Sequence, residues 1–325
     1  MCGKALSPSL NNVPSHKADW SSYDINMHDL PNSILHTVKY SDLFDYPLTE
    51  KEIHRYLIGV QASPEQVHAF LKNSQWTSRH LSHKDGYFAL SGRESIIEIR
   101  RQRATISLHL WRKAVRYGRQ IASLPYVRMV AVTGTLAVDN AEPGADIDYL
   151  IVTEPHRLWL VRSLVILLVH IARLESLVLC PNYLMTVEAL EQFEHSLFTA
   201  HELAQMVPLY GTDVYRQLLN QNDWARCFFP NAFDDHRIRV LEHRAAALTG
   251  LKHMIESILA GRLGDWWEQH IQSTKIPQLT AQAHKRKSKS AAFTPQLCKG
   301  HMDDHSQKIT RLYANHIKRT DYSPE

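Results

Sequence analysis

The sequence predicts an α+β protein in which a small mixed β-sheet is flanked by helical modules. Two short segments, 126–133 and 146–153, are rich in β-branched and apolar residues and are bounded by turn residues, as strands are. Long stretches before and after them carry apolar residues at helical spacing. The chain has 325 residues, 44% of them apolar, which is enough for two or three modules with a core each.

Helix and hairpin signals mark the part of the chain that precedes these strands. Residues 31–44 carry apolar side chains at helical spacing, and capping motifs that begin at Thr49 and Ser63 start two further helices. Asp85-Gly86 then separates two short strand-like segments, which is a strong signal for a two-residue hairpin. Three helices followed by a hairpin resemble a winged helix-turn-helix.

Two uses of this module stay open at this point. A third helix that reads DNA carries side chains able to contact bases and phosphates, and this one offers Gln66, His68, Lys72 and Asn73. Glu65 works against phosphate binding. The module therefore either binds nucleic acid, or contacts a protein or positions a substrate beside an active site.

A basic helix from about residue 93 to 121 connects the module to the strands. Arg112, Arg116 and Arg119 lie on one face of it, because they recur at four and three residues. They either form a solvated face, or they or Arg128 at the head of the first strand contact a triphosphate or a polyanionic acceptor.

The most informative residues surround the connection between the two strands. Asp146 and Asp148 alternate with Ile147 along a strand, so both carboxylates point the same way while Ile147 faces the opposite layer. Carboxylates this close repel each other, and Mg²⁺ or Mn²⁺, which take oxygen ligands, would relieve the repulsion. Gly134 permits a tight turn, and the Thr135 hydroxyl and nearby amides are able to bind phosphate oxygens. The arrangement suits phosphoryl or nucleotidyl transfer.

This stretch resembles the nucleotidyltransferase superfamily, to which the polymerase-β-like enzymes belong. Their hallmark is Gly-Ser or Gly-Gly followed, at about this distance, by Asp-x-Asp on the next strand. The resemblance implies that Gly134 and Thr135 bind a nucleoside triphosphate, and that Asp146 and Asp148 are catalytic residues that ligate the metal ions. Thr135 stands where serine is usual.

The superfamily pattern also includes a third carboxylate on a later strand, and here the sequence departs from it. A predicted helix over 156–174 is followed by a predicted strand over 177–187, which contains no Asp or Glu. Asn182 lies near the middle of this strand and Glu188 lies just past its end. Either the third ligand is neutral, or Glu188 supplies it and is the third catalytic residue.

Helical periodicity returns after the sheet, over 194–206, 212–221 and about 234–260. Many small-molecule nucleotidyltransferases carry a helical domain at this place that helps to close the acceptor pocket, and this segment looks like one. Asn222, Trp224 and Asn231 are candidates for that pocket, with a role in the core as the alternative for Trp224.

We expect six segments in order along the chain. They are a flexible tail (1–30), a winged-helix-like module (31–92), a basic connecting helix (93–123), a nucleotidyltransferase core (124–192), a helical domain (193–272) and a basic, disordered tail (273–325). Disorder is predicted for the last segment because its composition changes and because 284–290 is a basic, low-complexity run.

Composition narrows the class of protein. The four cysteines have neither disulfide-framework nor CxxC spacing, which favours a reducing compartment and predicts no zinc site. A formal net charge of +4 permits a nucleic-acid partner without requiring one. The most apolar stretch, 158–174, is interrupted by charged residues and is too short for a bilayer span. We therefore expect a cytoplasmic protein without a membrane segment.

Two functions follow as hypotheses. The first is a metal-dependent nucleotidyltransferase that moves a nucleoside monophosphate from a nucleoside triphosphate to the hydroxyl of an unknown acceptor, with Mg²⁺ or Mn²⁺ as cofactor. The second is a catalytically weak or inactive nucleotide-binding regulatory protein whose winged helix binds DNA or a protein partner. The retained Asp-x-Asp favours the first, and the missing strand carboxylate favours the second.

Overall fold

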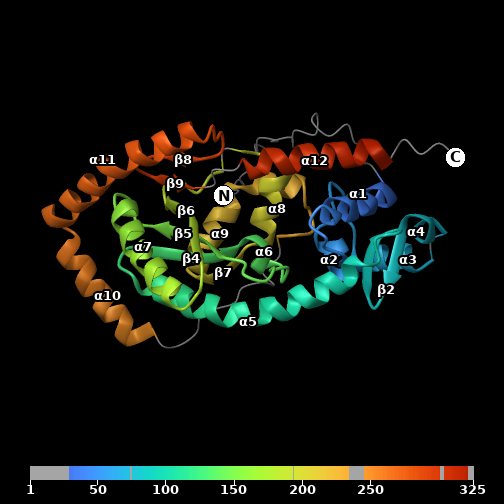
Figure 1. Ribbon diagram of the computed structural model, residues 1–325, viewed down its shortest axis with the longest axis horizontal. Coiled ribbons are helices and arrows are strands. Elements are labelled where there is room, and N and C mark those ends of the chain that lie inside the picture. The colour runs from blue at the N-terminus through green and yellow to red at the C-terminus, as the bar shows by residue number, and fades with distance from the viewer. Residues whose placement is uncertain (1–28, 74, 193, 234–244, 301–303, 321–325) are drawn as a thin grey trace, which may run out of the picture.

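A six-stranded mixed sheet forms the centre of the molecule (Figure 1). The computed structural model describes residues 29–320 except 74, 193, 234–244 and 301–303, so the predicted tail at 1–30 lies almost entirely outside it. The strand order is β7-β4-β5-β6-β9-β8. The strands are β4 (Val127–Thr133), β5 (Ile147–Thr153), β6 (Leu179–Thr186), β7 (Val207–Tyr210), β8 (Ala292–Phe293) and β9 (Leu297–Lys299). The predicted α+β class is confirmed.

The two strands that carry the motif are neighbours, as predicted. β4 and β5 pair antiparallel, with Thr133 opposite Asp148. From β5 the chain continues through helix α7 (Leu158–Leu174) to β6, which runs parallel to β5. Because a parallel pair needs a crossover connection, α7 has to lie over the sheet. The three predicted strands and the predicted crossover helix are therefore confirmed.

Helices cover both faces of this sheet (Figure 1). On one face, α5 (Ile96–Ser123) and α7 share a core with Ile147 and Ile151 of β5. The other face is covered by α8 (Leu197–Gln205), α9 (Thr212–Gln221), the 3₁₀ helix η1 (Asp223–Cys227) and α12 (His305–Thr320). Leu150 and Val152 belong to this second core. β5 is therefore packed on both faces. Burying each side chain of this size stabilises the fold by roughly 1.5–3 kcal/mol.

The N-terminal module contains the predicted helices and hairpin. Its elements are α1 (Leu30–Asp42), β1 (Leu48–Thr49), α2 (Glu50–Arg55), α3 (Pro64–Asn73), α4 (Gln75–His80), β2 (Leu81–Lys84) and β3 (Tyr87–Leu90). The capping box at Thr49 forms, since its hydroxyl accepts from the amide of Glu52 while the Glu52 carboxylate accepts from the amide of Thr49. The module packs against the central body, where the Tyr46 hydroxyl donates to the Val138 carbonyl at 2.8 Å.

The prediction of disorder over 273–325 is wrong for the residues that the structure describes there. Helix α11 (Arg262–Lys285) runs on through the start of the basic run. β9 then pairs with β6, with Cys298 opposite Leu184, and α12 buries Tyr313. Composition suggested a solvated tail, but apolar residues spaced among the basic ones supply a strand and an amphipathic helix. Strands from outside 124–192 therefore complete the sheet.

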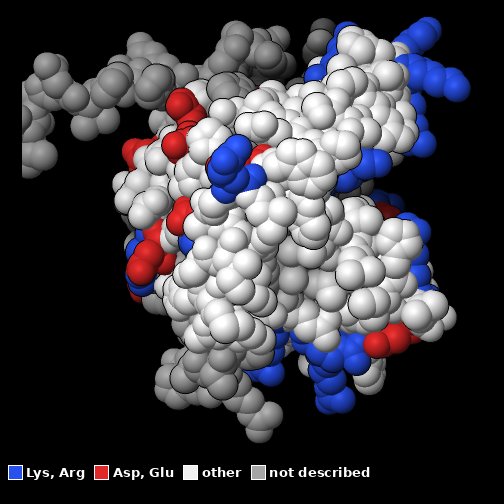
Figure 2. All heavy atoms as spheres, turned by 90° about the vertical axis from the view of Figure 1, so that its left-hand side faces the viewer, with Lys and Arg blue, Asp and Glu red and all other residues white. Residues whose placement is uncertain are grey.

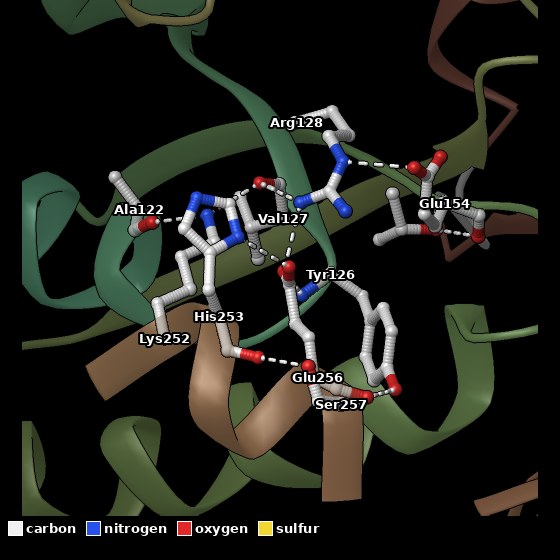
Figure 3. Close-up of polar contacts among 10 residues, drawn as sticks. Ala122, Tyr126, Val127, Arg128, Glu154, Lys252, His253, Glu256 and Ser257 are labelled. Carbon is white, nitrogen blue, oxygen red and sulfur yellow. Dashed lines mark hydrogen bonds and ion pairs between the residues drawn. The ribbon is translucent and has the colours of Figure 1, made fainter. Parts of the chain in front are cut away.

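Helix α10 (Ala245–Leu259) is attached to the start of β4 by polar contacts (Figure 3). The Lys252 ammonium donates to the carbonyls of Ala122 at 3.0 Å and Val127 at 2.7 Å. Burial, with a further contribution from Arg128, lowers the pKa of Lys252 to about 8. The Glu256 carboxylate accepts from the Tyr126 amide at 2.6 Å, and Arg128 donates to Glu256 at 2.9 Å.

One end of the molecule presents few charges (Figure 2). Large apolar side chains are exposed on three helices there, namely Leu167, Ile171 and Leu174 of α7, Leu251, Met254 and Ile258 of α10, and Leu263, Trp266 and Trp267 of α11. Figure 2 shows Lys and Arg side chains gathered along one edge of this uncharged surface. Among the helices described, none is long and apolar enough to cross a membrane.

Candidate functional site

The site begins at the tight turn that ends β4. The short helix α6 (Gly134–Ala137) starts there, and Gly134 has φ +66°, a conformation that side chains disfavour. A Cβ atom at this position would lie 2.5 Å from Oδ2 of Asp148. Both the backbone conformation and the neighbouring carboxylate therefore favour glycine at this position, since a Cβ would force the Asp148 side chain to move.

The two aspartates lie together on the face of the sheet that α8 covers. Even-numbered residues of β5 such as Leu150 belong to the core on that face, whereas Ile147 belongs to the opposite core. Asp148 is even-numbered and Asp146 precedes it by two residues, so the predicted alternation holds. One ligand atom of Asp146, one of Asp148 and the sulfur of Cys180 all lie within 4.8 Å of one another.

Among the residues described, Cys180 and not a third carboxylate lies beside the two aspartates. It is the Cα partner of Asp148 across the parallel β5–β6 pair. Cys180 was not among the predicted site residues, because the predicted third ligand was an acidic or amide residue near the middle or past the end of the strand. The sequence carries no direct signal for it, because pairing the predicted strand starts, 146 and 177, sets Leu179 opposite Asp148, whereas the strands pair from Ile147 and Leu179.

Glu188 is not brought to the aspartates, so the structure does not support the alternative in which Glu188 supplies the third ligand. It is exposed in the turn after β6. With a rise of about 3.3 Å per residue, the end of β6 at Thr186 lies about 20 Å along the strand from Cys180. The parallel register therefore puts Glu188 at the opposite end of the sheet. The side chain of Asn182 lies outside the described residues.

A cavity of about 360 Å³ opens beside the aspartates. Its walls come from elements far apart in sequence: Tyr40, Phe44 and Tyr46 from α1 and the loop after it, Gly134 and Thr135 from α6, Phe198 and Glu202 from α8, and Lys299 from β9. Thr135 is exposed, so its hydroxyl is accessible to a ligand. The N-terminal module and the C-terminal segment thus both take part in the site.

The charges on the cavity wall are mostly negative. Besides Asp146 and Asp148, it contains Glu194 and Glu202, and Lys299 lies 3.9 Å from the Glu194 carboxylate. Burial raises the pKa of Glu202 to about 7, an effect that Lys299 partly offsets. A carboxyl group with such a pKa exchanges protons near neutral pH, which is a property of general acids and bases.

Several residues proposed for the site are used elsewhere. Arg112, Arg116, Arg119 and Arg128 do not line the cavity among the residues described, and neither do Asn222, Trp224 and Asn231. Helix α5 lies on the sheet face opposite to Asp148, where Arg116 pairs with Glu175. Arg128 pairs with Glu154 at 3.1 Å and with Glu256. Trp224 is buried in the core, as the alternative for it predicted.

The chain was compared with protein families, curated proteins and solved structures. No protein-family model, no curated protein and no solved structure matches the chain.

Proposed function

We propose that this protein is a metal-dependent nucleotidyltransferase with a polymerase-β-like nucleotidyltransferase core. The observation that carries the proposal is the convergence of Asp146 and Asp148 next to the Gly134 turn, at the edge of a cavity large enough for a small molecule. An Asp-x-Asp in a solvated turn would have neither the glycine packed against its carboxylate nor a cavity beside it.

Each residue has a role that follows from its place. Asp146 and Asp148 would hold Mg²⁺ or Mn²⁺, which when bound neutralises phosphate charge and polarises the reacting oxygens. Gly134 lets the backbone approach the phosphates closely, and the Thr135 hydroxyl donates to a phosphate oxygen. The acceptor would occupy the cavity, where its hydroxyl oxygen would bond to the α-phosphorus as the bond from the α-phosphorus to the bridging oxygen breaks and pyrophosphate leaves.

Glu202 supports the acceptor side of this reaction. It is a carboxylate in the cavity with a pKa raised to about 7, so it is able to take the proton that the acceptor hydroxyl loses. Aromatic side chains of the N-terminal module line the same cavity. This favours the substrate-positioning use of that module over nucleic-acid binding. Nucleic-acid binding would instead predict that the protein binds a DNA duplex at low salt and that this affinity falls steeply as salt is added.

A second candidate is a protein that binds a nucleotide without turning it over. The observation that favours it is the composition of the cluster, since among the residues described the aspartates are joined by Cys180 and by no third carboxylate. Under this alternative the triphosphate binds and no pyrophosphate appears.

The test uses the double variant Asp146→Asn, Asp148→Asn. Its affinity for nucleoside triphosphate in Mg²⁺ or Mn²⁺, measured by calorimetry, should fall at least tenfold, or about 1.4 kcal/mol. Asp213→Asn, at an exposed aspartate of α9, is the matched control and should bind as the wild type does. The wild type is then incubated with labelled triphosphate and with pooled small molecules, protein and RNA. Label that appears on an acceptor shows transfer, and label that stays on the triphosphate shows binding alone. Unchanged affinity in a folded double variant contradicts the site.

A further inference from the structure

Cys180 joins the two aspartates because of the way β5 and β6 pair. Its Cα partner across the parallel pair is Asp148. Paired residues on neighbouring strands lie about 4.8 Å apart and point to the same face of the sheet. The thiol and the two carboxylates consequently offer three ligand atoms within 4.8 Å of one another, all on partly buried side chains.

This spacing suits a single metal ion. Bonds of about 2.0–2.2 Å to oxygen and about 2.3 Å to sulfur place two donors around one ion at most about 4.5 Å apart. Small rotations of the three side chains are enough to reach that separation. The strands themselves need no rearrangement, since β5 is paired with β4 and β6, and β6 is paired with β5 and β9.

A sulfur donor changes which ions the site prefers. Mg²⁺ is a hard ion that takes oxygen ligands, whereas thiolates select softer ions such as Zn²⁺. We propose that Cys180 is the third ligand of a two-carboxylate, one-thiolate centre that takes Zn²⁺ or Co²⁺ in preference to Mg²⁺. The thiol gives its proton to solvent as the bond between sulfur and the ion forms.

The role of this metal centre rests on the proposed function, because the same two aspartates would hold the ion during nucleotidyl transfer. Metal binding itself is independent of that reaction and is measured without nucleotide or acceptor. The two proposals therefore fail separately. Transfer in Mg²⁺ without any sulfur–metal bond contradicts the thiolate centre alone, and a sulfur–metal bond without nucleotide binding contradicts the proposed function alone.

The decisive measurement is the absorption spectrum of the full-length protein during titration with Co²⁺. A bond between a thiolate and Co²⁺ produces a charge-transfer band in the near ultraviolet, which oxygen ligands do not produce. We expect this band in the wild type and in Cys227→Ser, which removes an exposed thiol and is the matched control. We expect the band to be lost in Cys180→Ser, a substitution of nearly equal size.

Calorimetry with Zn²⁺ and with Mg²⁺ supplies a second, independent readout. Cys180→Ser should weaken Zn²⁺ binding at least tenfold while Mg²⁺ binding changes less than about twofold, because the sulfur contributes to the first ion only. Cys180→Asp should strengthen Mg²⁺ binding, since it supplies a third carboxylate and keeps a ligand at this position. A cobalt band that persists in Cys180→Ser, equal losses for both ions, or a wild type without the band would each overturn the proposal.

Discussion

At the scale of single residues, the site depends on contacts between side chains that the strands bring together. Gly134 shows this most directly, because the turn conformation and the neighbouring Asp148 carboxylate both disfavour a side chain. The turn conformation was predictable from the residue type. The contact with Asp148 was not, because it depends on the β4–β5 register.

The first prediction at this scale is that Gly134→Ala costs more stability than Gly144→Ala. Both glycines have positive φ, of +66° and +79°, so both substitutions carry the conformational cost of about 1–2 kcal/mol. A Cβ at Gly144 meets no atom within 4 Å, whereas one at Gly134 meets Asp148. Overpacking adds roughly 1–3 kcal/mol to the cost of Gly134→Ala, measured by denaturant unfolding. Equal losses for both variants would contradict the packing of Gly134 against Asp148.

A second residue-scale prediction concerns the pH dependence of stability of the metal-free protein. The pKa of Glu202 is raised from 4.5 to about 7, so its contribution to stability is fully present below pH 4.5 and is lost as pH rises through 7. Glu202→Gln should therefore be more stable relative to the wild type at pH 8 than at pH 5. Unfolding at both pH values checks this, with Glu188→Gln in the exposed turn as control. No pH-dependent difference would show that Glu202 is not buried as the cavity requires.

At the scale of elements, the position of a strand's first residue decides which residues meet. The predicted strand 177–187 and the observed β6 differ by two residues at its start and one at its end. Pairing the first residues of the two predicted strands, 146 and 177, would set Leu179 opposite Asp148, whereas the observed register sets Cys180 there. Local sequence predicts that a strand exists, but its pairing register is set by the partner strand and by the crossover helix.

Helix α10 provides the element-scale prediction, because one of its carboxylates, that of Glu256, accepts from two groups at the start of β4 (Figure 3). Glu256→Ala leaves the Tyr126 amide and one Arg128 N–H group without an acceptor, which should cost about 1–3 kcal/mol of unfolding free energy. Met254→Ala, at a side chain 54% exposed on the same helix, is the control and should cost much less. Equal effects in denaturant unfolding would mean that the attachment contributes nothing specific.

At the scale of the whole molecule, the first and last helices of the described chain meet. α1 and α12 pack together, and the Tyr313 hydroxyl of α12 contacts His36 of α1 at 3.3 Å (Figure 1). The cavity forms between these parts and the central strands. A site built from distant segments requires the complete fold.

We therefore expect a chain that ends after Lys285 to lose its stable fold. The truncation removes β8, β9 and α12, and with them the buried side chains Ile309, Tyr313 and Ile317. At roughly 1.5–3 kcal/mol each, these alone approach the 5–15 kcal/mol that stabilises a typical domain. Soluble yield and thermal unfolding followed by circular dichroism measure the loss, with a chain ending at residue 320 as control. A truncated protein with the unfolding midpoint of the full chain would support a dispensable tail instead.

Most of the secondary structure, and the Gly134, Asp146 and Asp148 part of the site, were determined by the sequence itself. Capping boxes, hairpin turns and hydrophobic periodicity involve only a few neighbouring residues, so they can be recognised in the sequence without knowledge of the fold. The tertiary structure alone decided that β9 joins the sheet and α12 covers one of its faces, that residues of the N-terminal module line the cavity, and that Cys180 lies beside Asp148. These facts depend on pairing and packing between segments tens to hundreds of residues apart, and no local pattern encodes a register across that distance.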